Sequence, residues 1–124
     1  MRRIFPLLIV IALAVMPAAF AESLDSLLVN GGIDAVSDAG FPTGWYRDMW
    51  FTDPAVSSLT VEADGVGGNT LCVTNLEIND ARWAQDVAVE PGTLYRLSAM
   101  VRADGLGEDG YGANLSVRDT FSYS

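Results

Sequence analysis

The sequence predicts a small all-β domain, an antiparallel sandwich or barrel, in the part of the chain that follows residue 21. Short apolar runs are separated by Gly, Pro, Asn and Asp, which is typical of such folds. Apolar and polar residues alternate over 95–101, as they do in a strand with one buried face. Residues 22–124 show no helical periodicity beyond a single turn expected near 53–57.

In the first half, each expected strand ends at turn residues. The first strand, 26–29, ends at Asn30-Gly31-Gly32, and a turn-rich loop over 40–44 leads into Trp45-Tyr46. Gly and Asn mark these turns because they tolerate positive φ. The remaining strands expected in this half are 49–51, 58–62 and 70–75.

The second half has the clearer pattern. An expected strand at 84–89 is followed by Glu90-Pro91-Gly92, a turn in which Pro presets φ and Gly supplies a positive φ. The strand at 95–101 places Tyr95 and Leu97 inward, with Arg96 and Arg102 on the opposite face. Residues 113–117 alternate in the same manner.

The N-terminal segment has the features of a secretory signal peptide, residues 1–21. Arg2 and Arg3 precede an apolar run over 4–16, and Ala19-Phe20-Ala21 supplies the small residues that signal peptidase requires. The run is short for a membrane span, which needs about 20 apolar residues. We therefore expect export, to the periplasm or the extracellular space, with an uncleaved anchor as the alternative.

Composition excludes several functions. Arg2 and Arg3 lie in the leader, so residues 22–124 keep five of seven basic residues and all 16 acidic ones, for a net charge of −11. Such a charge argues against nucleic acid and anionic membranes as partners. The single Cys72 cannot form an intrachain disulfide, and the absence of His removes Ser-His-Asp chemistry. A carboxylate pair stays possible by count, but no catalytic residue is expected.

Several segments together resemble the family 4/9-type carbohydrate-binding modules, the cellulose- and xylan-binding domains of bacterial glycoside hydrolases. The segments are Leu28-Val29-Asn30-Gly31-Gly32-Ile33-Asp34, Phe41-Pro42-Thr43-Gly44-Trp45-Tyr46, Asn69-Thr70-Leu71-Cys72-Val73, and the stretch from Gln85 to Ala99 with its Glu90-Pro91-Gly92 turn. They occur in the family's order over nearly all of residues 22–124.

The resemblance implies a jelly-roll, galactose-binding-like antiparallel β-sandwich over residues 22–124, with a groove or sheet face for a sugar chain. The family pattern continues for one or two strands beyond 120–124, so we expect an incomplete domain, the front part of a longer protein. A C-terminal catalytic domain is the expected neighbour.

Sugar binding requires flat aromatic faces and planar polar side chains. Trp50, Trp83 and Tyr111 lie in or next to polar, turn-rich segments, so we expect them at the ligand surface, with core or rim packing as the alternative. Arg102 and Asn114 project opposite to the core register, so they are expected to line the groove unless that face is ordinary solvated sheet. Trp45 and Tyr95 are expected in the core.

The family often holds a structural Ca²⁺. Asp34 occupies the position of the family's acidic residue after the Asn-Gly-Gly turn, so the resemblance implies Asp34 as a ligand, with carbonyls near Gly32 and Asn69. Calcium takes six to eight oxygen ligands. No other cofactor is expected.

The predicted function is non-catalytic polysaccharide or oligosaccharide binding, which targets an attached glycoside hydrolase or cell-surface protein to its substrate. The alternative is a structural or adhesion β-sandwich module that binds no sugar, since one fold serves many functions.

Overall fold

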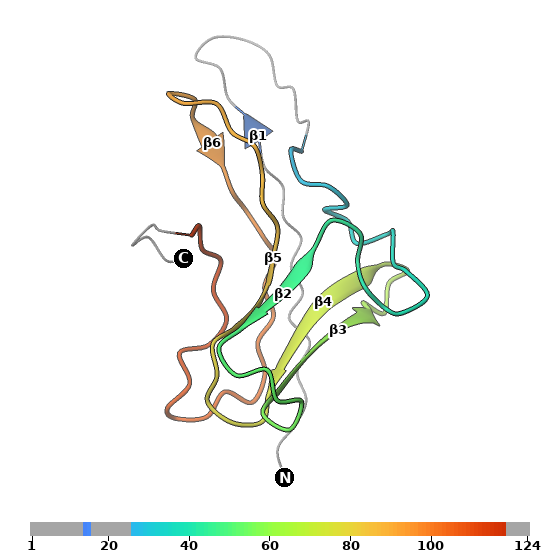
Figure 1. Cartoon of the computed structure of the whole chain (residues 1–124), viewed down its shortest axis with the longest axis vertical. Helices are drawn as coiled ribbons and strands as arrows, with labels where there is room; N and C mark the ends of the chain where they lie inside the picture. The colour runs from blue at the N-terminus through green and yellow to red at the C-terminus, as the bar shows by residue number, and fades with distance from the viewer. Residues whose placement is uncertain (1–13, 16–25, 119–124) are drawn as a thin grey trace.

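The computed structural model describes residues 14–15 and 26–118, and within them every regular element is a β-strand. The strands form three two-stranded antiparallel sheets, in which β1 pairs with β6, β2 with β5 and β3 with β4 (Figure 1). The all-β, antiparallel prediction is confirmed at this level. The bounds are β1 Ala14–Val15, β2 Tyr46–Met49, β3 Ser57–Ala63, β4 Asn69–Asn75, β5 Ala81–Ala84 and β6 Tyr95–Arg96.

The β3–β4 hairpin is the most regular part of the fold. Leu59 lies opposite Val73 and Val61 opposite Leu71, so one face of the hairpin is apolar. The turn is closed by Asp64, whose carboxylate accepts the backbone N–H groups of Val66 and Gly68, both at 2.8 Å. These two hydrogen bonds hold the pKa of the Asp64 carboxyl below its usual range, because they favour its charged form.

The core forms where the β2–β5 pair meets the β3–β4 hairpin. The Trp83 indole N–H on β5 donates to the Cys72 carbonyl on β4 at 3.1 Å, which ties the two pairs together. Burying each large apolar side chain stabilises the fold by about 1.5–3 kcal/mol. The buried apolar cluster comprises Ile33, Trp45, Leu59, Leu71 and Trp83.

Side-chain amides extend the backbone pairing where the ladders stop. In three places one carboxamide both accepts a hydrogen bond from the N–H of a residue and donates one to the carbonyl of the same residue. The pairs are Asn30 with Ala35 (3.0 and 2.8 Å), Gln85 with Val29 (2.7 and 2.8 Å), and Asn79 with Phe51 (3.0 and 2.9 Å).

These amide pairs explain two differences from the predicted strands. Residues 26–29 form no strand, because the backbone groups of Val29 bond to the Gln85 side chain and not to another backbone. The strand expected at 84–89 is displaced to β5, four residues long and ending at Ala84, one residue before that amide. The strands expected at 58–62 and 70–75 are confirmed as β3 and β4, and the turn near 53–57 is confirmed by the Asp53 carbonyl, which accepts from the N–H of Val56 at 2.9 Å. The strand expected at 49–51 is wrong: β2 ends at Met49, and Phe51 bonds to the side chain of Asn79 and not to another backbone.

The predicted strand 95–101 is a strand only at β6. There Tyr95 pairs with Val15 and Arg96 with Ala14 of β1. The expected inward register still holds in part, since Leu97 and Ala99 pack against the core while Val101 is exposed. Residues 113–117 form no named strand, although Leu115 also packs against the core.

Two further predictions concern the chain ends. The expected signal peptide, residues 1–21, lies outside the described residues except for Ala14–Val15, and so does the end of the chain at 120–124. Within residues 14–15 and 26–118 no helix has the length and apolar character needed to span a membrane.

Candidate functional site

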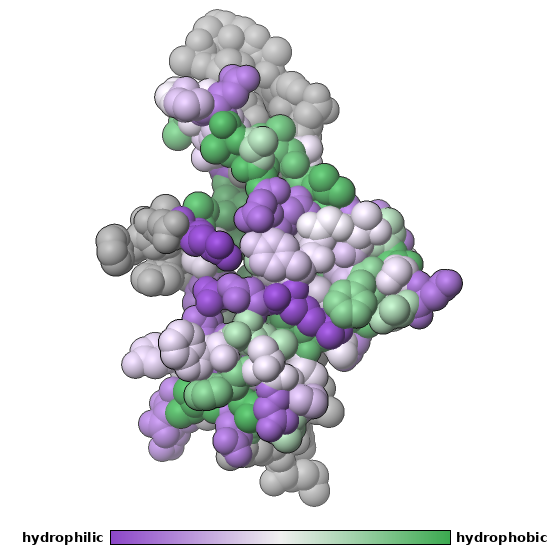
Figure 2. All heavy atoms as spheres, in the orientation of Figure 1, coloured by the Kyte–Doolittle hydropathy of each residue, from purple (hydrophilic) through white to green (hydrophobic). Residues whose placement is uncertain are grey.

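The exposed face of the β2–β5 pair concentrates planar and charged side chains. Cross-strand register places Tyr46 opposite Ala84 and Asp48 opposite Arg82. Since side chains alternate along a strand, these residues share one face. The other face carries Trp83 into the core. Figure 2 shows hydrophilic side chains gathered across the molecule at the level of β2 and β5.

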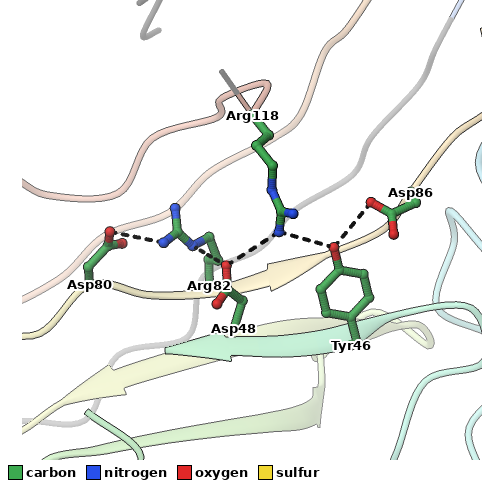
Figure 3. A network of polar contacts seen from close by, with 6 residues as sticks. All are labelled: Tyr46, Asp48, Asp80, Arg82, Asp86 and Arg118. Atoms are coloured by element: carbon green, nitrogen blue, oxygen red, sulfur yellow. Dashed lines mark hydrogen bonds and ion pairs between the residues drawn. The ribbon is translucent and has the colours of Figure 1, made fainter. Parts of the chain in front are cut away.

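A polar network covers this face, with Arg82 and Asp48 at its centre (Figure 3). The Arg82 guanidinium lies 3.0 Å from Asp48 through Nε and 3.0 Å from Asp80 through an Nη. We call the whole set the polar network: Tyr46, Asp48, Asp80, Arg82, Asp86 and Arg118.

The network also joins the C-terminal part of the described chain to β2. The Arg118 guanidinium lies 3.8 Å from Asp48 and 3.5 Å from the Tyr46 hydroxyl, across 72 residues of sequence. The Tyr46 hydroxyl in turn donates to Asp86 at 3.2 Å. These contacts of Arg118 are the longest drawn in the network, and its side chain is 68% exposed.

Stability does not account for this network. Its ion pairs are largely exposed, and exposed pairs contribute about 0–1 kcal/mol each. What the network provides is a set of fixed acceptors and donors in planar groups, three carboxylates and two guanidiniums, with one negative charge in excess. Such a surface suits a ligand rich in hydroxyl groups, each of which both donates and accepts.

Trp50 stands at one end of this face. Its N–H donates to the Asp80 carbonyl at 2.9 Å, which extends the β2–β5 pairing by one residue beyond Met49. The alternation then directs the indole to the same side as Tyr46 and Asp48. The side chain is 78% exposed, unusual for the largest apolar residue type. Four residues of extended chain place Tyr46 and Trp50 about 13 Å apart.

Trp83, expected at the ligand surface, is instead a core residue. Its side chain is 6% exposed, and the Arg47 guanidinium lies over its ring, 5.4 Å from the centroid. The physical reason is register: Trp83 pairs with Arg47 on the face of the β2–β5 pair that meets β4. Trp45 is buried as expected, whereas Tyr95 is only half-buried, with its hydroxyl accepting from the N–H of Glu90.

Tyr111, Arg102 and Asn114 are all exposed. Tyr111 is fully open to solvent, and Arg102 donates two hydrogen bonds to Asp104, at 3.1 and 2.9 Å. Across residues 26–118 no hydrogen bond, ion pair or ring contact joins any of these three to Trp50 or the polar network. The register of the β2–β5 pair therefore places Trp50 on the same face as residues that the sequence analysis did not select, above all Asp48 and Arg82.

Asp34, the expected calcium ligand, lies in the loop just after Gly32. The carboxylate folds back over Gly32, where an added Cβ would lie 2.9 Å from Oδ2. Asn69 directs its amide nitrogen at the Ile33 carbonyl, at 3.0 Å, and so offers a donor there where calcium needs an oxygen. Within the described residues no group of three or more acidic, His or Cys side chains is placed to hold a metal. The described residues alone do not fit a calcium shell, and Asp34 as a ligand stays a prediction.

The loop that carries Asp34 is strained. Ile33 has a φ of 57°, a conformation rare for a β-branched residue. Its side chain is almost fully buried, and its N–H donates to the Asn30 carbonyl at 3.1 Å. Burial in the core offsets the cost of this backbone conformation.

Comparison of the chain with protein-family models, with curated proteins and with solved structures finds no significant match in any of the three.

Proposed function

We propose that the chain is an exported, non-catalytic carbohydrate-binding module. Its sandwich would be of the jelly-roll, galactose-binding-like type, and it would direct a glycoside hydrolase or a cell-surface protein to a polysaccharide. The proposal rests on the resemblance of four segments to the family 4/9-type modules and on the chemistry of the β2–β5 face.

The observation that carries the proposal is Trp50. Its indole is 78% exposed at the end of a face lined with carboxylates and guanidiniums. An aromatic ring offers the apolar C–H face of a sugar a flat surface, while planar polar groups beside it bond to the hydroxyls. Exposing so large an apolar side chain gives up the benefit of burying it, so a ligand that covers the ring accounts for its position.

The polar network supplies the hydrogen bonds in this proposal. Asp48 and Asp80 accept from sugar hydroxyls, and Arg118 donates with a planar fork once it turns from its long contacts. Tyr46 lies about 13 Å from Trp50, on the scale of a short oligosaccharide. Tyr111, Arg102 and Asn114 remain proposed contacts on the loops outside this face.

Affinity electrophoresis tests the proposal. The folded chain is run in gels that contain soluble β-glucan, xylan or an unrelated polymer. We expect retardation in at least one polysaccharide gel, and a loss of retardation for Trp50→Ala. Val66→Ala is the matched control, because Val66 is 91% exposed in the β3–β4 turn and belongs to no part of the proposed site. Tyr111→Ala tests the loop contact separately.

The competing function, a structural or adhesion module, makes a different prediction. A folded chain that migrates unretarded in every polysaccharide gel would rule out the proposed sugar binding and favour an adhesion role. Retardation that survives Trp50→Ala would move the site away from the β2–β5 face.

A further inference from the structure

The structure assigns to Asn79 the role of a positioning residue for Trp50. This inference rests on the proposed function, in which Trp50 is the ring that meets the sugar. Asn79 touches no ligand in this account. It holds the backbone from which the indole projects.

The Asn79 carboxamide makes the same hydrogen bonds to Phe51 that the backbone of a neighbouring strand would make. Its Oδ1 accepts from the N–H of Phe51 at 3.0 Å, and its Nδ2 donates to the Phe51 carbonyl at 2.9 Å. A carboxamide carries an acceptor and a donor side by side in one plane, so it gives Phe51 both hydrogen bonds that a strand would give. No side chain with acceptors alone can do this.

The pairing with Asn79 continues the ladder past Trp50. The last cross-strand pair is Met49 with Ala81, Trp50 then donates to the Asp80 carbonyl, and Phe51 bonds to Asn79. Three consecutive residues, Met49 to Phe51, are thus held by residues 79–81, the start of β5 and the two residues before it. Since the exposed indole receives little packing, its backbone decides where it points.

Asn79 is itself anchored in the β3–β4 hairpin. Its Nδ2 also donates to the hydroxyl of buried Ser57 at 2.7 Å, and its carbonyl accepts from Asn75 Nδ2 at 3.0 Å. Asn75 in turn accepts from the Ser57 hydroxyl at 2.7 Å. A flexible loop would have to order Trp50 on binding, and ordering a side chain and its loop weakens affinity. The anchored Asn79 removes that cost before the ligand arrives.

The test compares Asn79→Ala and Asn79→Asp with the control Asn69→Ala. Asn69 also donates an amide hydrogen bond to a backbone carbonyl, that of Ile33 at 3.0 Å, but it lies at the opposite end of the β3–β4 hairpin from Asn79. ¹⁵N relaxation reports the order parameters of the Phe51 amide and the Trp50 indole N–H, and affinity electrophoresis reports binding. We expect both Asn79 variants to lower the two order parameters and to weaken binding roughly three- to tenfold. Asn69→Ala should leave both readouts unchanged, whatever it does to stability.

Asn79→Asp keeps the size of the side chain and protects the test against misfolding of the alanine variant. It keeps the acceptor for the Phe51 N–H but turns the donor into a second acceptor facing the Phe51 carbonyl. Unchanged order parameters in both Asn79 variants would overturn the inference, whether or not any sugar binds. Equal loss of binding in Asn69→Ala would also overturn it, since the effect would then not be specific to the pairing of Asn79 with Phe51.

The same data separate this inference from the proposed function. If the wild-type chain binds no polysaccharide but the order of Trp50 falls in the Asn79 variants, the positioning role is supported and sugar binding is the part that fails.

Discussion

Trp50 and Trp83 belong to the same antiparallel pair of segments but serve opposite purposes. Trp83 points into the core and donates to the Cys72 carbonyl, whereas Trp50 points outward beside the polar network. Their sequence surroundings are similar, since both lie next to polar turn residues. Only the cross-strand register decides which of them is buried, and it pairs Trp83 with Arg47 on the core side.

Substituting the two tryptophans separates stability from binding. Trp83→Ala removes a buried ring and is expected to lower the free energy of unfolding by about 3–5 kcal/mol. Trp50→Ala removes an exposed ring and should change it by no more than about 0.5 kcal/mol. Urea unfolding followed by far-UV circular dichroism measures both. A large loss of stability in Trp50→Ala would show that this ring packs against the fold.

Asp64 makes the β3–β4 turn sensitive to acid. Its folded pKa is lowered from 3.8 by the N–H groups of Val66 and Gly68, so the carboxylate stabilises the fold above pH 3.8. That contribution is lost as the pH falls through the lowered value. Asp64→Asn keeps an oxygen acceptor but does not titrate. We therefore expect the stability difference between the wild type and this variant to shrink from pH 7 to pH 3 in urea unfolding.

A stability difference that stays constant over this pH range would contradict the assignment of the Asp64 hydrogen bonds. Other acidic residues titrate in both proteins, so they cancel in the comparison.

The candidate site was only partly predictable at the scale of residues. The sequence selects Trp50 correctly as an exposed ring, because it lies in a polar segment between Asp48 and Asp53. It does not select Asp48 or Arg82, because the sequence alone does not distinguish them from the other charged residues at the surface. Only the cross-strand register brings the Arg82 guanidinium to 3.0 Å from Asp48. The available signal was the alternation of Tyr46, Asp48 and Trp50, which places all three on one face of β2 and the residue after it.

Among the elements, the short strands depend on side-chain amides. Gln85 donates to the Val29 and Gly44 carbonyls, at 2.8 and 2.9 Å, and accepts from the Val29 N–H at 2.7 Å. Gly44 has a φ of 83°, and a Cβ there would lie 2.9 Å from Val29. The approach of these three residues therefore needs both the amide and the glycine.

Gln85→Ala tests this dependence. The variant removes hydrogen bonds to three backbone groups that water can still reach, so we expect a loss of about 0.5–1.5 kcal/mol in the free energy of unfolding. Gln85→Glu keeps an acceptor for the Val29 N–H but no donor for the two carbonyls, and should lose a comparable amount. Hydrogen exchange at the Val29 amide should become faster in the alanine variant. Unchanged exchange would mean that the segment before Asn30 is held by other contacts.

The same feature explains which elements the sequence could predict. The β3–β4 hairpin was predictable because its alternation and its Asp-Gly turn are local in sequence. Residues 26–29 form no strand, and the strand expected at 84–89 lies at β5. Neither result was predictable, because alternation shows which face of a segment is buried but not which backbone or side chain the segment bonds to. Nothing local distinguishes Gln85 as a residue that replaces a strand.

At the scale of the whole molecule, net charge and site chemistry point to the same class of ligand. The chain carries a net charge of −9, and the polar network has one excess negative charge. Repulsion of this kind acts over about 10 Å at 0.1 M salt and weakens as salt rises. It disfavours polymers of acidic sugars without affecting a neutral one.

Salt dependence therefore tests the proposed mode of binding. Ring stacking and hydrogen bonds to neutral hydroxyls release no counterions. The dissociation constant for a neutral polysaccharide should therefore change less than about twofold between 50 and 200 mM salt. Over the same range, charge-driven binding to a polyanion weakens by orders of magnitude. Titration calorimetry with a soluble glycan measures this directly. A steep loss of affinity with salt would show that the guanidiniums of Arg82 and Arg118 bind an anionic group, and the ligand would then belong to a different chemical class.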